Sequence, residues 1–109
     1  MKTMAKFIFK STGHYLGFIT MDGNIFSRDG IYLGWIEEED GKHYAWDTEG
    51  QFRGILKEIN ENSCYILKNI YSISPVPRKP KSMPSTPAIP APPANISATV
   101  LPIGIRDAF

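Results

Sequence analysis

One seven-residue pattern occurs three times in the first half of this chain. Residues 13–19, 30–36 and 50–56 each begin with a glycine and carry a second glycine four positions later, and their starts lie 17 and 20 residues apart. An aromatic residue lies four positions before each first glycine: Phe9, Phe26 and Trp46. A spacing of this kind is typical of a repeat architecture in which each copy is one supersecondary unit.

Each copy predicts a β-hairpin. In the first copy, the β-prone runs 7–10 and 14–19 are separated by a turn that ends at Gly13, where a tight turn needs a positive φ. Asp22-Gly23 and Asp40-Gly41 are further hairpin signals between the copies. The pattern therefore predicts a meander of six short strands from about residue 5 to residue 58.

A fourth, degenerate unit follows, with expected strands over residues 64–68 and 70–73 and no glycine pair. We therefore predict an all-β body over residues 1–73, with units at about 7–19, 24–36, 43–56 and 64–73. All nine prolines lie between residues 75 and 102. We expect residues 74–95 to be a proline-rich, extended linker of the polyproline II kind.

The expected strands are apolar on both faces, which indicates that both faces are covered. A body of this size buries only part of its surface by itself, so the cover is either a second copy of the chain or the tail. Residues 96–109 are predicted to dock, because they end in apolar side chains: Ile103, Ile105 and Phe109. Self-association, with a tetramer possible, and docking of the arm in cis or in trans remain open.

The second glycine of each copy lies inside an expected strand, where glycine is unfavourable. We interpret these glycines as points of close backbone approach; the alternative is a gap for the flat face of a ligand: Gly17, Gly34 and Gly54. The repeated aromatic residues are the candidate interaction or ligand surface: Tyr15, Tyr32, Trp35, Tyr44, Trp46 and Phe52.

Composition favours no special class of partner. The net charge of +1 predicts no general attraction to nucleic acid or to a membrane, although residues 1–72 carry a net −2 and the remainder a net +3. A single cysteine excludes an intrachain disulfide, which together with the lack of a signal-peptide core favours the cytoplasm.

No catalytic set is evident. Cys64 has no histidine in a motif with it, and His14 and His43 occupy non-equivalent positions of the repeat. The acidic run 37–40 precedes a hairpin glycine and lacks the alternation of an EF-hand, so we expect a solvated turn. We predict no enzyme activity, no metal and no cofactor.

The units at 9–19 and 26–36, their variant at 46–56 and the proline-rich arm together resemble the 4-fold beta flower proteins, a small bacterial family. The resemblance covers about residues 5–73. It implies hairpin petals around a fourfold or pseudo-fourfold axis, either within one chain or between chains. It implies no activity, cofactor or catalytic residue.

The stretch from Gly34 to Gly50 also resembles choline-binding cell-wall repeats. That resemblance implies an aromatic cage of Trp35, Tyr44 and Trp46 for a quaternary ammonium or a sugar. The basic run 78–81 with its Pro-x-x-Pro spacings is similar to a ligand for an SH3-like groove. We therefore predict a non-enzymatic module for self-assembly or protein interaction; the alternative is a module that binds a small ligand or offers its arm to a partner's groove.

Overall fold

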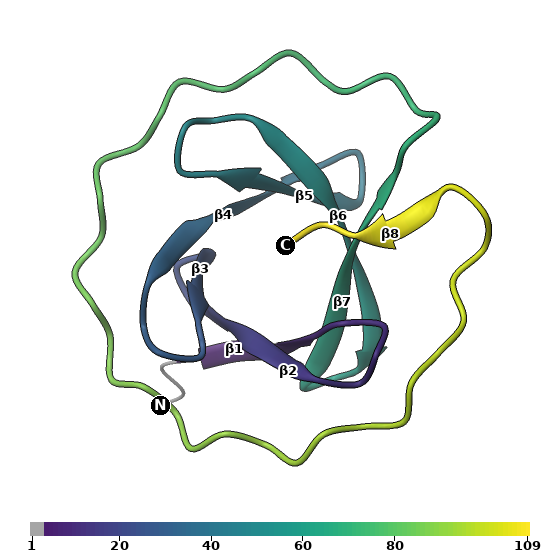
Figure 1. Cartoon of the computed structure of the whole chain (residues 1–109). Coiled ribbons are helices and arrows are strands. Elements are labelled where there is room, and N and C mark those ends of the chain that lie inside the picture. Colours follow the sequence, from purple (N-terminus) through teal and green to yellow (C-terminus); the bar gives the residue numbers. More distant parts are fainter. Residues whose placement is uncertain (1–3) are drawn as a thin grey trace.

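The computed structural model describes residues 4–109, and these residues contain strands and no helix. The strands are β1 (Met4–Phe9), β2 (Tyr15–Thr20), β3 (Asn24–Ser27), β4 (Tyr32–Glu39), β5 (Lys42–Asp47), β6 (Phe52–Asn60), β7 (Ser63–Asn69) and β8 (Ile105–Asp107). Neighbouring strands pair antiparallel in chain order. A short parallel pairing of Phe7 and Ile8 with Ser63 and Cys64 joins β1 to β7 and closes a seven-stranded barrel, and β8 adds to β7 (Figure 1).

Four units surround the barrel axis: β1–β2, β3–β4, β5–β6 and β7–β8 (Figure 1). The first three are the predicted hairpins, and their glycine-containing turns are equivalent. In each, the glycine N–H donates to the residue three positions earlier, as from Gly13 to the carbonyl of Lys10 at 2.8 Å. The prediction of an all-β fold with four petals is confirmed, and the fourfold arrangement lies within one chain.

The fourth unit differs from the expected one. Residues 70–72 form a turn and residue 73 is irregular, so the expected strand over residues 70–73 is absent. The second strand of this unit is β8, which pairs with β7 through Leu67 and Asp107, Lys68 and Arg106, and Asn69 and Ile105. More than thirty residues separate the two strands in sequence, and local patterning does not reveal a pairing between segments so far apart.

The sheet buries apolar side chains on both of its faces. The inner cluster fills the barrel: Ile8, Ile19, Ile25, Ala45, Cys64 and Ile66, with Ala108 and Phe109 of the C-terminus. The outer cluster is aromatic and lies between the barrel and the arm: Phe18, Phe26, Tyr32, Trp35 and Trp46, with Phe7, Tyr44 and Phe52 at its margin. The alternation of apolar residues in each strand follows from this two-sided burial.

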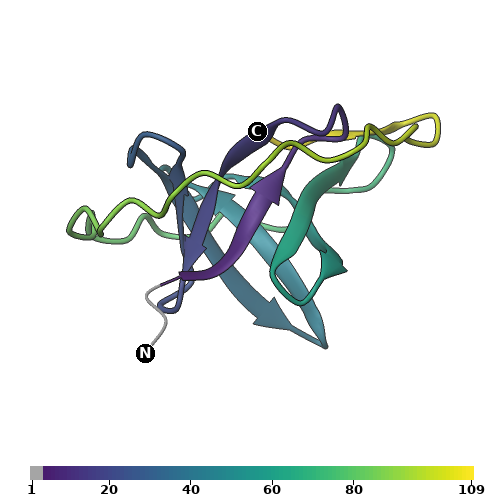
Figure 2. The ribbon, with the colours of Figure 1, turned by 90° about the horizontal axis from the view of Figure 1, so that it is seen from below.

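The arm, residues 73–102, has no regular secondary structure and runs once around the barrel (Figure 1). Figure 2 shows that it lies towards the end of the barrel where the C-terminus is found. Its half-buried residues between 75 and 96 are spaced by multiples of three: 75, 78, 84, 87, 90, 93 and 96. A polyproline II helix has three residues per turn, so this spacing is the one expected if one edge of such a helix faced the body; the prediction of that conformation for residues 74–95 stays a prediction.

Candidate functional site

The arm contacts the turn of each hairpin at the first glycine of the repeat. The N–H of Arg78 donates to the carbonyl of Gly50 at 2.7 Å, and the N–H of Ile96 donates to that of Gly13 at 2.9 Å. Gly30 lies under the side chain of Ile89, whose Cδ1 is 3.1 Å from the position a Cβ would take. These glycines have φ between 82° and 90°, which the turn requires and which favours glycine. The same glycines thus form the turns and contact the arm.

Two cations of the arm lie over the two tryptophans. The guanidinium of Arg78 lies 4.8 Å from the ring centre of Trp46, and the ammonium of Lys81 lies 5.1 Å from that of Trp35. Both are within the range of a cation–π interaction. Glu37 completes the cluster: it accepts a hydrogen bond from Trp35 Nε1 at 2.8 Å and pairs with Arg78 at 3.3 Å.

The predicted aromatic surface is therefore not open to solvent. Trp35 and Trp46 are 1% and 0% exposed, and Tyr15 and Tyr32 are also buried. Tyr44 and Phe52 are half-buried and pack edge to face with ring centres 5.8 Å apart. The faces that an ammonium ligand would take in the expected cage are occupied by cations of the same chain.

Burial also raises the pKa of two tyrosines, Tyr15 and Tyr32. Desolvation raises the pKa of Tyr15 above its usual value, and the positive charge of Arg28 opposes this in part. Desolvation raises the pKa of Tyr32 as well. Both hydroxyls and Trp46 Nε1 are buried with no hydrogen-bond partner among the described residues.

The second glycines lie where strands of neighbouring units approach most closely. A Cβ on Gly17 would overlap the carbonyl oxygen of Phe26, and one on Gly34 would overlap that of Trp46. A Cβ on Gly54 would lie 2.6 Å from the carbonyl oxygen of Leu67. The space beside each glycine is filled by backbone of the next unit, which leaves no gap for the flat face of a ligand.

The C-terminal segment closes one end of the barrel. Ala108 is buried and donates its N–H to the carbonyl of Ile66 at 2.9 Å, and Arg53 donates from Nε to the carbonyl of Ala108 at 2.9 Å. The Arg53 guanidinium also lies 4.7 Å from the ring centre of Phe109. Figure 1 shows the C-terminus on the barrel axis.

The predicted docking residues of this segment differ from one another. Phe109 packs against the inner cluster and Ile105 is half-buried in β8, whereas Ile103 is 93% exposed in a turn. Asp107 fixes β8 to the first unit, because its carboxylate accepts from the N–H and the hydroxyl of Ser11 at 2.8 and 2.7 Å. Asp107 was not predicted as a functional residue, and the signal available was that it is the one acidic residue in the otherwise mostly apolar segment 96–109.

The residues considered for catalysis lie on different elements: Cys64 in β7, His43 in β5 and His14 in the turn before β2. Cys64 lies inside the barrel, and burial raises the pKa of its thiol from 9.0 to about 12. His14 and His43 are exposed on different hairpins. The described part of the chain contains no group of three or more His, Cys, Asp or Glu side chains that could hold a metal ion. Of the acidic run, Glu37 and Glu39 pair with Arg78, so this run is more than the solvated turn that was expected.

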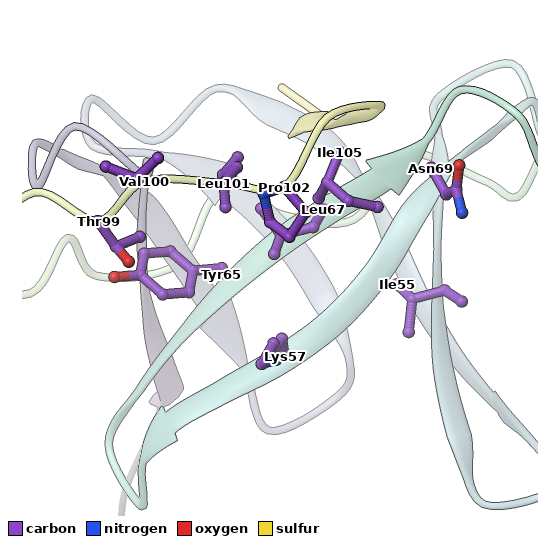
Figure 3. Close-up of a pocket in the computed structure, with 10 residues that line it drawn as sticks. All are labelled: Ile55, Lys57, Tyr65, Leu67, Asn69, Thr99, Val100, Leu101, Pro102 and Ile105. Carbon is purple, nitrogen blue, oxygen red and sulfur yellow. The ribbon is translucent and has the colours of Figure 1, made fainter.

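A cavity lies between the outer face of β6 and β7 and the last part of the arm (Figure 3). It has a volume of about 390 Å³ and mostly apolar walls. A second pocket, of about 250 Å³, lies near the opposite end of the barrel and includes Lys6, His43 and Glu58. Lys6 is already held there by Glu58 at 3.4 Å and by the carbonyl of Glu61 at 2.9 Å.

A closed β-barrel made of hairpin units, encircled by its own proline-rich arm, defines the class of this protein. The model of the 4-fold beta flower protein family matches residues 2–101, and the chain belongs to that family. No match was found among curated proteins or among solved structures. Within the described residues, no helix is long and apolar enough to span a membrane.

Proposed function

We propose that this protein is a non-enzymatic interaction module whose arm is the surface that a partner protein contacts. The observation that carries the proposal is the position of the exposed large apolar side chains. Among residues 6–109, eight of the eleven exposed large apolar side chains lie between residues 70 and 103, and Val76, Met83 and Val100 are each at least 77% exposed. Exposed apolar groups of this size, gathered on one segment, mark interaction sites.

The arm is also held in shape before any partner arrives. Its backbone donates hydrogen bonds to the hairpin turns from Arg78 and Ile96, and its prolines restrict the backbone angle φ. A proline-rich segment in the polyproline II form is recognised by aromatic-lined grooves, and preorganisation lowers the entropic cost of binding. The half-buried edge stays with the body, which leaves the exposed edges for a groove on the partner.

Other features support a module without catalytic activity. The buried thiol of Cys64 has a raised pKa, so its thiolate is scarce at neutral pH. The two histidines lie on separate units: His14 shares a hydrogen bond with the exposed hydroxyl of Thr12 at 2.9 Å, and His43 lies 3.4 Å from a carboxylate oxygen of Glu38. A general acid, base and nucleophile need to converge on one reacting atom, and these residues do not.

The proposal is tested with purified SH3 and WW domains as probes and the full chain as ligand. A triple variant, Val76→Ser with Met83→Ser and Val100→Ser, removes the exposed apolar groups of the arm. The matched control, Met21→Ser with Ile31→Ser, removes apolar groups that are 63% exposed on the body. We expect saturable binding of at least one domain to the wild type and the control, and at least a tenfold loss in the triple variant.

Self-association through the same side chains is the second candidate, and light scattering coupled to size exclusion tests it. A molar mass that rises with concentration in the wild type and not in the triple variant would favour a second copy as the partner. A monomeric wild type that binds none of the probe domains would overturn the arm as an interaction surface. An unchanged thermal midpoint in the triple variant excludes misfolding as the cause of any loss.

A further inference from the structure

Three antiparallel seams join successive units of the barrel, and equivalent residues face each other in each. The paired residues on the outer face are Phe18 with Phe26, Trp35 with Trp46, and Ile55 with Leu67. In the first seam the two rings stack with centres 5.7 Å apart. The third seam therefore has aliphatic side chains where both preceding seams have two aromatic rings.

The cavity of about 390 Å³ lies at this third seam (Figure 3). Ile55 and Leu67 line it from the barrel, and the arm segment 99–102 lines it from outside. The arm continues its path around the barrel, while the side chains beneath it are smaller than in the other seams. The missing aromatic volume accounts for the cavity, whose size is in the range of small-molecule sites.

The charge at the third seam is also different. In the second seam Glu37 is the Cα partner of Tyr44, and at the equivalent place in the third seam Lys57 is the partner of Tyr65. The arm meets Glu37 with Arg78 at 3.3 Å and Lys81 at 3.9 Å. Over Lys57, by contrast, the arm segment 99–102 contains no acidic residue, and Lys57 makes no ion pair among the described residues.

The third seam thus lacks the pair of aromatic rings that the second seam contains, and Lys57 lacks the oppositely charged arm side chains that Glu37 has there. Lys57 carries the one charge among the described residues that line it. The nearest acidic group of β8, Asp107, is already bound by Ser11. Hydroxyls of Tyr65 and Thr99 and the amide of Asn69 add polar groups to the lining (Figure 3).

We infer that this cavity binds a small aromatic carboxylate, with one or two fused rings between the arm and the strands and the carboxylate towards Lys57. The rings of the ligand would fill the space that two aromatic side chains occupy in each of the other seams and that Ile55 and Leu67 leave empty. Lys57 occupies the position equivalent to Glu37, so the carboxylate would take the place that the cations of Arg78 and Lys81 hold in the second seam, with the charges of the pair exchanged. Of the exposed arm residues that carry the proposed function, Val100 also lines this cavity, and the tests below leave it unchanged, so the two proposals can fail separately.

The experiment titrates the full ¹⁵N-labelled chain with naphthalene-2-carboxylate and follows backbone amide shifts by NMR. We expect saturable shifts confined to residues around the cavity, such as Tyr65, Leu67 and Leu101. Naphthalene-2-carboxamide, the neutral analogue, should bind about fivefold more weakly, the size of effect that one partly exposed charge pair gives. Lys57→Gln should remove this difference, whereas Lys42→Gln, at an exposed lysine of β5, should preserve it.

A cavity-filling variant tests the location. Ile55→Trp restores the residue type of Trp35 at the equivalent position, and it should abolish the shifts. Leu67→Phe, which copies Phe26, is the second variant if Ile55→Trp does not fold. Undiminished binding in a folded filled variant would overturn the inference.

Three other results would also overturn it. These are the absence of saturable shifts at the millimolar concentrations expected for a ligand of this size, equal affinity for the acid and the amide in the wild type, and tighter binding of N-acetyl-tryptophanamide than of the acid. The last result would indicate an aromatic side chain of a protein as the occupant.

Discussion

The substitution Gly17→Ala should be among the most damaging single-atom additions to this chain. Gly17 is the Cα partner of Ser27 across the first seam. A Cβ there would lie 2.9 Å from the Cα of Ser27 and 3.0 Å from the carbonyl carbon of Phe26, and it would overlap the Phe26 oxygen. Carbon atoms prefer separations of about 3.5–4.0 Å, so the two strands would have to move apart.

The cost can be worked from these contacts. Overpacking against a backbone that cannot rotate away costs about 3 kcal/mol, at the upper end of the usual range. Loss of one ladder hydrogen bond adds about 1 kcal/mol. Alanine lowers the entropy of the unfolded chain and returns about 1 kcal/mol, so the net loss of unfolding free energy is about 3 kcal/mol.

A matched control separates this steric effect from backbone strain. Gly41 has φ of 79°, and a Cβ on it would meet nothing within 4 Å. Gly41→Ala should therefore cost only the left-handed conformation, about 1–2 kcal/mol before the same unfolded-state gain. No positive φ occurs at Gly17, so backbone strain does not contribute to its cost.

Urea denaturation followed by tryptophan fluorescence measures both variants, because Trp35 and Trp46 are buried and become exposed on unfolding. A loss of about 3 kcal/mol corresponds to a fall of roughly 15 °C in the thermal midpoint of a chain of this size. If Gly17→Ala costs no more than Gly41→Ala, the close backbone approach is not what requires glycine there, and the reasoning fails.

Three further predictions follow from the contacts of the arm and the core. Truncation to residues 1–73 removes the cover of the outer aromatic cluster and the end of the barrel, so it should abolish cooperative unfolding and produce dye-binding apolar surface. Arg78→Ala removes cation–π and ion-pair contacts of a half-exposed side chain and should lower stability by about 1 kcal/mol in a denaturation curve, whereas Lys79→Ala, at an exposed neighbour, should not. Ionisation of Cys64 should not affect the unfolding free energy below pH 9. From pH 9 towards about pH 12 the unfolding free energy should fall, because the thiol releases its proton at lower pH in the unfolded state than in the folded state. Cys64→Ala should make this fall shallower.

The sequence was sufficient to predict three of the four units, because their determinants are local. Each hairpin has its own turn glycine and its own β-prone runs, and these lie within about fourteen residues of each other. The fourth unit required the pairing of Leu67 with Asp107, and nothing near either residue indicates the other. The closure of β1 on β7 is equally non-local, which is why the sequence left a ring of four chains open.

The candidate site could be predicted only as a set of residue types. The alternation of residues in the expected strands indicated that Trp35 and Trp46 belong to an apolar face, and in the structure both lie in the outer aromatic cluster. Which face the arm covers depends on the path of some thirty residues without regular secondary structure. From the sequence, Arg78 and Lys81 belong to a basic run that resembles a ligand for a partner's groove. In the structure both side chains lie over the chain's own tryptophans.

One periodic signal of the arm explains how it fits a fourfold body. Prolines recur at positions 75, 84, 93 and 102, a spacing of nine residues. Nine residues of a polyproline II helix would be three full turns and about 28 Å. Pro75, Pro84 and Pro93 are half-buried, as this spacing predicts, whereas Pro102 is exposed. The arm meets Gly50 at residue 78, Gly30 between residues 86 and 89, and Gly13 at residue 96, one step for each unit. The arm therefore has a repeat of its own that matches the repeat of the barrel. An insertion or deletion in the arm that is not a multiple of three residues would turn an exposed edge of the arm towards those glycines in place of the half-buried edge.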